Sequence, residues 1–189
     1  MWQRSRRSPE VVAQSGVSRT FQNIRLFQTM TALENVLVGM DRNLRVGFFE
    51  SMLRLPRHFK EKRQAVSRAR EMLEFVGLVE YAGTEAGCLP YGHQRRLEIA
   101  RALASGPTLL LLDEPAAGMN PSESVDLMEL INKIKSKGIT VLLIEHHMRV
   151  VMGISDRIAV LDYGNKIAEG TPEEIRANEK VISAYLGKA

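Results

Sequence analysis

Two short apolar runs on either side of one well-marked helix constrain the fold of this chain more than any other feature. The runs are Thr108–Leu112 and Ile139–Ile144, and neither has the polar alternation of a strand with one wet face. Between them, Asn120, Pro121 and Glu123 have the pattern of an N-cap, a proline in the first helical position and a reciprocal acid. Strand, helix and strand predict a right-handed parallel unit in an α/β sheet, with strands buried on both faces.

The rest of the chain predicts more helices and one hairpin. Apolar residues recur at helical spacing over about Lys60–Val76, and another helix should end near Ala104. Arg157–Leu161 reads as a strand, and the turn DYGN leads back into Lys166–Ala168 as its hairpin partner. The following TPEE has the pattern of a second capped helix start.

Composition excludes several classes of protein. The 189 residues are 44% hydrophobic and 25% charged, which suits one globular domain with a core rather than a disordered chain. Cys88 is the only cysteine, so the sequence has neither a disulfide framework nor a CxxC metal site and fits a reducing compartment. No apolar run is long enough to span a bilayer, and the basic N-terminal MWQRSRR lacks the apolar stretch of a signal peptide. We therefore expect a cytosolic or peripheral protein.

The basic charge is concentrated in residues 41–70. This segment holds nine Arg or Lys against three acids, so its local net charge of +6 exceeds the +4 of the whole chain. Such a segment can be a solvated helix face, a contact with a membrane surface or a partner, or a nucleic-acid contact. The segment alone does not choose among these alternatives.

Polar side chains follow both apolar runs. Asp113 and Glu114 come directly after the first run, and Glu145, His146 and His147 after the second. In open α/β sheets, ligands bind at the carboxyl ends of the strands, where one carboxylate can hold Mg²⁺ and another can orient or deprotonate a water. Each group alone could equally be an ordinary loop. Because the ends of consecutive parallel strands should lie side by side, we expect a shared site.

Several motifs in order carry a resemblance to a known family. The chain contains five motifs in the order in which the nucleotide-binding subunits of ABC transporters carry them: RTFQN, LPYGHQRRLEIARAL, LLLLDEPAAGMNP, VLLIEHHM and DRIAVLDYGNKIAEGTPEEI. From about Gly16 to Ala189 the chain resembles most the ATPase subunits of branched-chain amino acid importers. The resemblance implies a P-loop NTPase-like (ABC ATPase) α/β fold, with a parallel sheet flanked by helices, an α-helical signature subdomain, and the N-terminal part of the fold missing.

The resemblance also implies a domain organisation. Residues 1–189 would form a single, N-terminally truncated nucleotide-binding domain: a helical and signature subdomain over about 24–104, the catalytic core strands over 105–170, and C-terminal helices over 171–189. The basic stretch from about Leu44 to Arg70 would belong to the helical subdomain, which faces the permease and the membrane surface. Thr31 and Glu34 would form a capping box in the same subdomain.

The resemblance implies catalytic or metal-supporting roles for four residues. Gln22 matches the Q-loop glutamine, which touches the metal and the attacking water. Asp113 matches the Walker B aspartate that supports Mg²⁺, and Glu114 matches the catalytic carboxylate. His146 matches the switch histidine, which contacts the terminal phosphate. The resemblance thus implies ATP and Mg²⁺ as cofactors.

A second set of residues would face the nucleotide held by a partner subunit. Leu89–Gln94 matches the signature motif, whose backbone and following helix N-terminus face the γ-phosphate; helix N-termini favour anions. Pro90 replaces the usual serine, and we expect its fixed φ to suit the first turn of the helix. Asn120, in the D-loop region, replaces the usual aspartate, so its role is weaker. The expected contacts come from Tyr91, Gly92, His93 and Gln94.

The implied function is ATP hydrolysis coupled to the import of branched-chain amino acids. The expected partners are a second ABC ATPase subunit, membrane permease subunits and, indirectly, an extracytoplasmic amino acid-binding protein, with no nucleic acid. The expected location is peripheral, on the cytoplasmic face of the plasma (inner) membrane.

One motif that such an ATPase needs does not occur in the sequence. None of the 14 glycines heads a GxxxxGK followed by Ser or Thr, the loop that cradles the phosphates. A truncated gene or misassigned start, a fragment of a longer chain, and a genuine short protein stay open. We expect the isolated chain to bind ATP weakly if at all, and its sheet to have an exposed edge or a missing centre. The alternative function is a non-catalytic interaction module, or truncated remnant, that docks on a permease or a sister ATPase.

Overall fold

The computed structural model describes residues 8–40 and 56–186 in two compact units, the first ending at Ile144 and the second starting at Glu145. The N-terminal MWQRSRR and the first half of the basic segment, 41–55, lie outside the described residues. No helix in the described ranges has both the length and the hydropathy needed to cross a bilayer.

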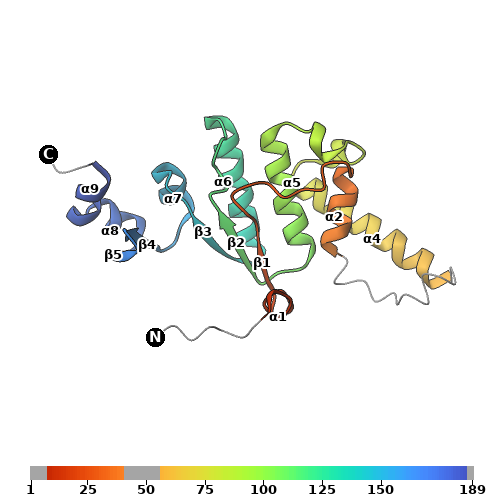
Figure 1. The fold of residues 1–189 in the computed structure, drawn as a ribbon, viewed down its shortest axis with the longest axis horizontal. Helices are drawn as coiled ribbons and strands as arrows, with labels where there is room; N and C mark the ends of the chain where they lie inside the picture. Colours follow the sequence, from red (N-terminus) through yellow and green to blue (C-terminus); the bar gives the residue numbers. More distant parts are fainter. Residues whose placement is uncertain (1–7, 41–55, 187–189) are drawn as a thin grey trace. The chain divides into compact units, whose positions relative to one another are not determined.

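The first unit contains a parallel three-stranded sheet, ordered β1-β2-β3 (Figure 1). Its strands are β1 (Val17–Arg19), β2 (Leu109–Asp113) and β3 (Thr140–Ile144). The pairing of β2 with β3 confirms the predicted parallel unit, and Asp113 lies opposite Ile144. The sequence did not predict β1, which is only three residues long and pairs with β2 in parallel.

The helix that joins β2 to β3 is α6 (Pro121–Ser136), and its start is as predicted. Asn120 is the N-cap: its side chain accepts a hydrogen bond from the Glu123 N–H at 2.9 Å, and its own N–H donates to Glu123 Oε2 at 2.9 Å. These two bonds satisfy backbone groups that a helix start leaves unpaired. The cap therefore fixes where the chain turns after β2.

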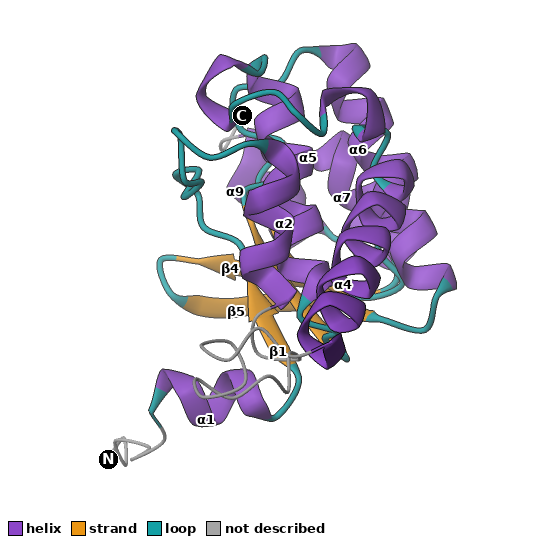
Figure 2. Cartoon of the chain, turned by 90° about the vertical axis from the view of Figure 1, so that its right-hand side faces the viewer, coloured by secondary structure: helices purple, strands orange, loops and turns teal. Residues whose placement is uncertain are grey.

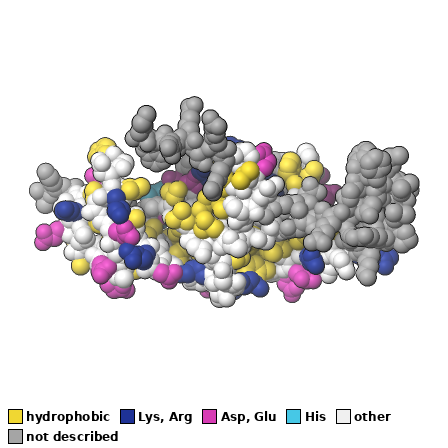
Figure 3. Space-filling model, turned by 90° about the horizontal axis from the view of Figure 1, so that it is seen from below, with side chains coloured by type: hydrophobic (Ala, Val, Ile, Leu, Met, Phe, Trp, Pro, Cys, Tyr) yellow, Lys and Arg dark blue, Asp and Glu magenta, His cyan; other side chains and the backbone are white. Residues whose placement is uncertain are grey.

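The two faces of the sheet differ in burial. Leu110 and Leu112 on β2 are almost fully buried, whereas Leu142 and Ile144 on β3 are 56% and 57% exposed. The expectation of strands buried on both faces is therefore wrong for β3, because Leu142 and Ile144, which lie on the same face of the strand, are exposed. Hydrophobic side chains also gather at the surface in the middle of the view in Figure 3.

Helices make up the rest of the first unit, and three of them pack together: α2 contacts both α4 and α5, and α4 contacts α5 (Figure 2). The predicted Thr31–Glu34 capping box is present, with both the backbone N–H and the hydroxyl of Thr31 donating to Glu34 Oε2 at 2.8 Å. The helix predicted from Lys60 begins four residues earlier, at Pro56. The bounds are α1 (Pro9–Gln14), α2 (Ala32–Met40), α4 (Pro56–Phe75), α5 (Tyr91–Ala104) and two 3-10 turns, η2 (Val79–Tyr81) and η3 (Ala86–Cys88).

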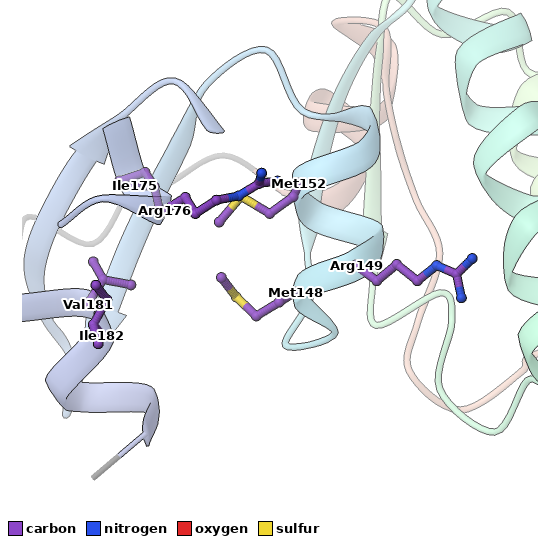
Figure 4. A pocket seen from close by; sticks show the side chains of 7 residues that line it. All are labelled: Met148, Arg149, Met152, Ile175, Arg176, Val181 and Ile182. Atoms are coloured by element: carbon purple, nitrogen blue, oxygen red, sulfur yellow. The ribbon is translucent and has the colours of Figure 1, made fainter. Parts of the chain in front are cut away.

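The second unit has a small core of its own. The predicted hairpin is present as an antiparallel pair, β4 (Ile158–Asp162) with β5 (Asn165–Gly170), and Thr171 caps the next helix with a capping box. Its helices are α7 (Met148–Ile154), α8 (Pro172–Arg176) and α9 (Glu179–Leu186). An apolar groove of about 370 Å³, drawn in Figure 4, is lined by Met148, Arg149, Met152, Ile175, Arg176, Val181 and Ile182.

Candidate functional site

The carboxyl end of β2 places two acids in different backbone conformations. Asp113 is the last residue of the strand, and Glu114 follows it with φ of 45°, in the left-handed region. A non-glycine residue there costs about 1–3 kcal/mol, so surrounding contacts must hold it. One such contact is the Glu114 N–H, which donates to the Ile144 carbonyl at 2.9 Å.

Gln22 reaches this acid from far away in the sequence. Its Nε2 donates to Glu114 Oε2 at 2.7 Å across a sequence separation of 92 residues. The approach follows from β1, because its parallel pairing with β2 carries the loop after Arg19 toward the carboxyl end of β2. The structure thus brings together Gln22 and Glu114, two residues to which the resemblance assigned catalytic roles, and those roles stay predictions.

Asp113 also has a partner from the same segment. Arg19 Nη2 lies 2.8 Å from Asp113 Oδ2, and the Arg19 side chain is half-exposed. Arg19 is the first residue of the RTFQN motif, but sequence reasoning assigned it no role. Its guanidinium neutralises Asp113 in this structure, and an ion pair this exposed is easily exchanged for another cation.

The residues at this end of the sheet suit a hard metal ion. A carboxylate and an amide oxygen are ligands that Mg²⁺ accepts, and this ion usually keeps several waters and substrate phosphates in its shell. No cluster of three or more His, Cys, Asp or Glu that could hold a metal ion occurs in the described part of the chain. Asp113 and Gln22 therefore fit a metal that arrives with a nucleotide.

The signature stretch forms the first turn of α5. Pro90 is the N-cap, with φ of −54° and extended ψ of 151°, and no side chain caps the helix. Pro90 thus directly precedes the first helical residue, Tyr91, and its φ lies in the range that the proline ring imposes. Gln94 turns back to the loop, donating from Nε2 to the Leu89 carbonyl at 2.8 Å. The centroid of the His93 ring lies 4.9 Å from that of Tyr81, and the two ring planes are tilted by 54°.

Two glycines bring the signature stretch close to the start of α6. A Cβ on Gly92 would lie 2.6 Å from Glu123 Oε1, and one on Gly118 would lie 3.3 Å from the Tyr91 ring. Glu123 is the acid of the α6 capping box, so Gly92 has a packing role within this chain besides any contact with phosphate. The Asn120 side chain is likewise used in capping α6, and its role toward nucleotide stays a prediction.

His146 belongs to the second unit. The N–H groups of His146 and His147 donate to Glu145 Oε2 at 3.0 and 3.2 Å, and the two imidazole rings lie 4.4 Å apart. The structure does not place this unit relative to the first, so the shared site of His146 with Glu114 stays a prediction.

Sequence reasoning missed a buried ion pair on α5. Arg95 and Glu98 are 0% and 2% exposed and lie 2.8 Å apart. Their three-residue spacing on a helix reads as a common surface pair, so no signal in the sequence marked them as buried.

Comparison with known proteins places these features in a family. Residues 3–117 match the family model described as ABC transporter, and residues 165–189 match that of the branched-chain amino acid ATP-binding cassette transporter. A high-affinity branched-chain amino acid transport ATP-binding protein of Pseudomonas aeruginosa, BraF, is 52% identical over 94% of this chain and 70% of its own length. The chain belongs to the family of branched-chain amino acid ABC transporter ATP-binding proteins. A second relative, LivG of Escherichia coli, is 50% identical to this chain over 94% of the chain and 70% of its own length.

Solved structures agree with this family and confirm the ABC ATPase fold class. A nucleotide-free ATP-binding cassette from an ABC transporter has a TM-score of 0.78 at 32% identity, covering 98% of this chain and 74% of that one. An ATP-binding cassette in its ADP conformation has a TM-score of 0.77 at 30% identity, with the same coverage. The chain is thus a member of a family of transport-coupled ATPases and spans about 70% of the length of its curated relatives.

Proposed function

We propose that this chain is the ATP-binding subunit of an importer for branched-chain amino acids and couples ATP hydrolysis to transport. The observation that carries the proposal is the 2.7 Å hydrogen bond from Gln22 to Glu114, made where Glu114 is held in a strained turn at the end of β2. Strained, over-determined backbone is typical of catalytic positions.

In this proposal the acids at the end of β2 divide the chemistry between them. Asp113 and the amide oxygen of Gln22 would hold Mg²⁺, which would supply positive charge to the phosphates. Glu114 orients the attacking water and accepts its proton, while Gln22 holds the Glu114 carboxylate in place. His146 contacts the terminal phosphate. Each role supposes ATP bound with Mg²⁺.

The signature stretch is proposed to act on the nucleotide of a second ATPase subunit. The first turn of α5 has no side-chain cap, so its backbone N–H groups are available to an anion. Tyr91 is partly exposed at this end of the helix. Gly92, His93 and Gln94 complete the turn, and Asn120 adds the D-loop contact.

A groove in the first unit supports a membrane permease as another partner. The groove has a volume of about 430 Å³, and its lining includes Phe27, Val38 and Arg101. Phe27 and Val38 are 47% and 42% exposed, and burial lowers the pKa of Arg101. Exposed apolar side chains beside a cation suit a protein segment with an apolar face. The subunit would then lie peripherally on the cytoplasmic face of the membrane, with an extracytoplasmic amino acid-binding protein engaged only through the permease.

ATP turnover by the transport complex assembled with this subunit tests the proposal. Glu114→Gln should lower kcat by about 10²–10⁴-fold, because it removes the base. Glu74→Gln, an exposed acid on α4, is the matched control and should leave turnover unchanged.

The same experiment decides the second candidate function, a non-catalytic module docked on a permease or sister ATPase. This candidate predicts that the complex still forms and that Glu114→Gln leaves its turnover unchanged, whereas a collapse of turnover eliminates it.

A further inference from the structure

The buried pair of Arg95 and Glu98 contacts more than itself. Arg95 Nη1 donates to Glu98 Oε2 and also to the Phe21 carbonyl at 2.7 Å, and Arg95 Nη2 donates to the Gln22 carbonyl at 2.8 Å. Glu98 Oε1 accepts the Arg25 N–H at 3.2 Å. The pair therefore holds the loop on both sides of Gln22, more than 70 residues away in sequence.

Stability alone does not account for a pair of charges in this place. Taking two charges out of water costs several kcal/mol per ion, and apolar side chains of similar volume often stabilise a fold as well or better. The rigid fork of an arginine can address two carbonyls and a carboxylate at once, which a flexible ammonium cannot do with the same geometry. The contacts of Arg95 thus fix the positions of the Phe21 and Gln22 carbonyls relative to α5.

The geometry that they specify concerns Gln22. Its backbone carbonyl is held by Arg95, while its side chain lies at the surface and donates to Glu114 at 2.7 Å. Without the backbone bond, an exposed loop residue would sample several rotamers, and its amide would leave Glu114 part of the time. A fixed backbone reduces that freedom at the point where the side chain starts.

We propose that the Arg95–Glu98 pair is a positioning device, which fixes the loop of Gln22 and thereby holds the Gln22 amide on Glu114. Arg95 follows directly on the signature residue Gln94 in the same helix, so the pair also ties the nucleotide-facing turn of α5 to the loop of Gln22. The catalytic consequence rests on the proposed function. The loop contact itself does not.

Hydrogen exchange in the full 189-residue chain tests the loop contact. The double variant Arg95→Met with Glu98→Leu removes both charges and leaves no unpaired charge in the core. We expect exchange at the Arg25 amide to rise at least about tenfold, because it loses a bond to a charged acceptor. Amides of β2 serve as the internal reference and should keep their wild-type rates if the fold persists.

Arg96→Lys is the matched control, because Arg96 is the neighbouring arginine and pairs at the surface with Asp126 at 2.6 Å. It should leave the Arg25 amide unchanged. The conservative variant Arg95→Lys should give an intermediate rate. If the double variant keeps the wild-type rate at Arg25 while β2 is intact, the proposed positioning device is refuted.

Steady-state kinetics of the assembled transport complex test the consequence. The double variant should lower kcat at least about tenfold with the KM for ATP within about twofold, since it disturbs the geometry around Glu114 rather than nucleotide binding. Arg95→Lys should restore part of kcat. An equal loss from Arg96→Lys, or an unchanged kcat despite a released loop, would overturn the catalytic role. If the unmodified complex has no ATP turnover, the proposed function fails, and the exchange experiment still decides the loop contact.

Discussion

Replacing Gly39 by alanine should separate α2 from α5, because the two helices lie in close contact at this glycine. A Cβ built there would overlap the backbone carbonyl oxygen of Arg101 on α5, and it would lie 3.0 Å from the Arg101 Cγ and 3.1 Å from the Ala104 Cβ. A backbone carbonyl cannot rotate away as the end of a long side chain can. The helices themselves would have to move.

The expected cost follows from two opposing effects. Overpacking a well-packed interface costs about 1–3 kcal/mol, and a clash with backbone should cost an amount at the upper end of this range, about 3 kcal/mol. Alanine in a helix interior is favoured over glycine by about 1 kcal/mol, which offsets part of this cost. The net loss in the free energy of unfolding should be about 2 kcal/mol, or about 4–8 °C in Tm for a chain of this size.

Urea unfolding followed by circular dichroism measures this loss, and Gly83→Ala is the matched control. Gly83 has no atom within 4 Å of its built Cβ and no positive φ, so alanine there should be neutral or stabilise by about 0.4–1 kcal/mol through the unfolded state. If Gly39→Ala proves as stable as Gly83→Ala, the close approach of α2 and α5 is wrong, and with it the packing that supports the signature helix.

Two further predictions concern the capping boxes. Asn120→Ala should lower the free energy of unfolding by about 1 kcal/mol, because the helix loses its N-cap, whereas Asn120→Asp should leave this free energy unchanged. The midpoints of urea unfolding measure both effects. Equal midpoints for the alanine and aspartate variants would contradict the role of the cap. Hydrogen bonds from the backbone N–H of Thr31, and then from its hydroxyl, lower the pKa of Glu34 below its ordinary value. The ionised carboxylate therefore stabilises the folded chain at pH values above the unfolded-state pKa, and this stabilisation is lost as the pH falls through the folded-state pKa. Glu34→Gln should therefore flatten the acid side of the stability profile, and an unchanged slope between about pH 3 and 6 would refute this.

Local patterns predicted the elements that local chemistry controls. The cap at Asn120, the box at Thr31 and Glu34, and the β4–β5 hairpin are all confirmed, because each depends on residues within a few positions of one another. The family resemblance assigned catalytic roles to Gln22 and Glu114, but it did not predict the hydrogen bond between them. This bond depends on the register of β1, a strand of three residues that the sequence did not predict.

The burial of β3 and of the Arg95–Glu98 pair could not be read from local patterns, because burial depends on contacts between distant parts of the chain. The apolar sequence of β3 predicted burial on both faces, yet Leu142 and Ile144 are exposed, because composition does not say whether another element covers a strand. The sequence analysis assigned no role to Arg95 and Glu98, yet they form a buried ion pair that contacts the loop of Gln22. In each case the deciding contact comes from a distant part of the chain.

The sequence by itself determined the parallel strand–helix–strand unit, the starts of its helices and the acids at the end of β2, because hydrophobic period, caps and turns act over a few residues. Only the tertiary structure decided that Glu114 occupies a strained turn, that Gln22 donates to it, and that a buried ion pair on α5 holds the backbone of Gln22. Such contacts join residues more than 70 positions apart, and their energies depend on distance and burial, which exist only once the chain has folded.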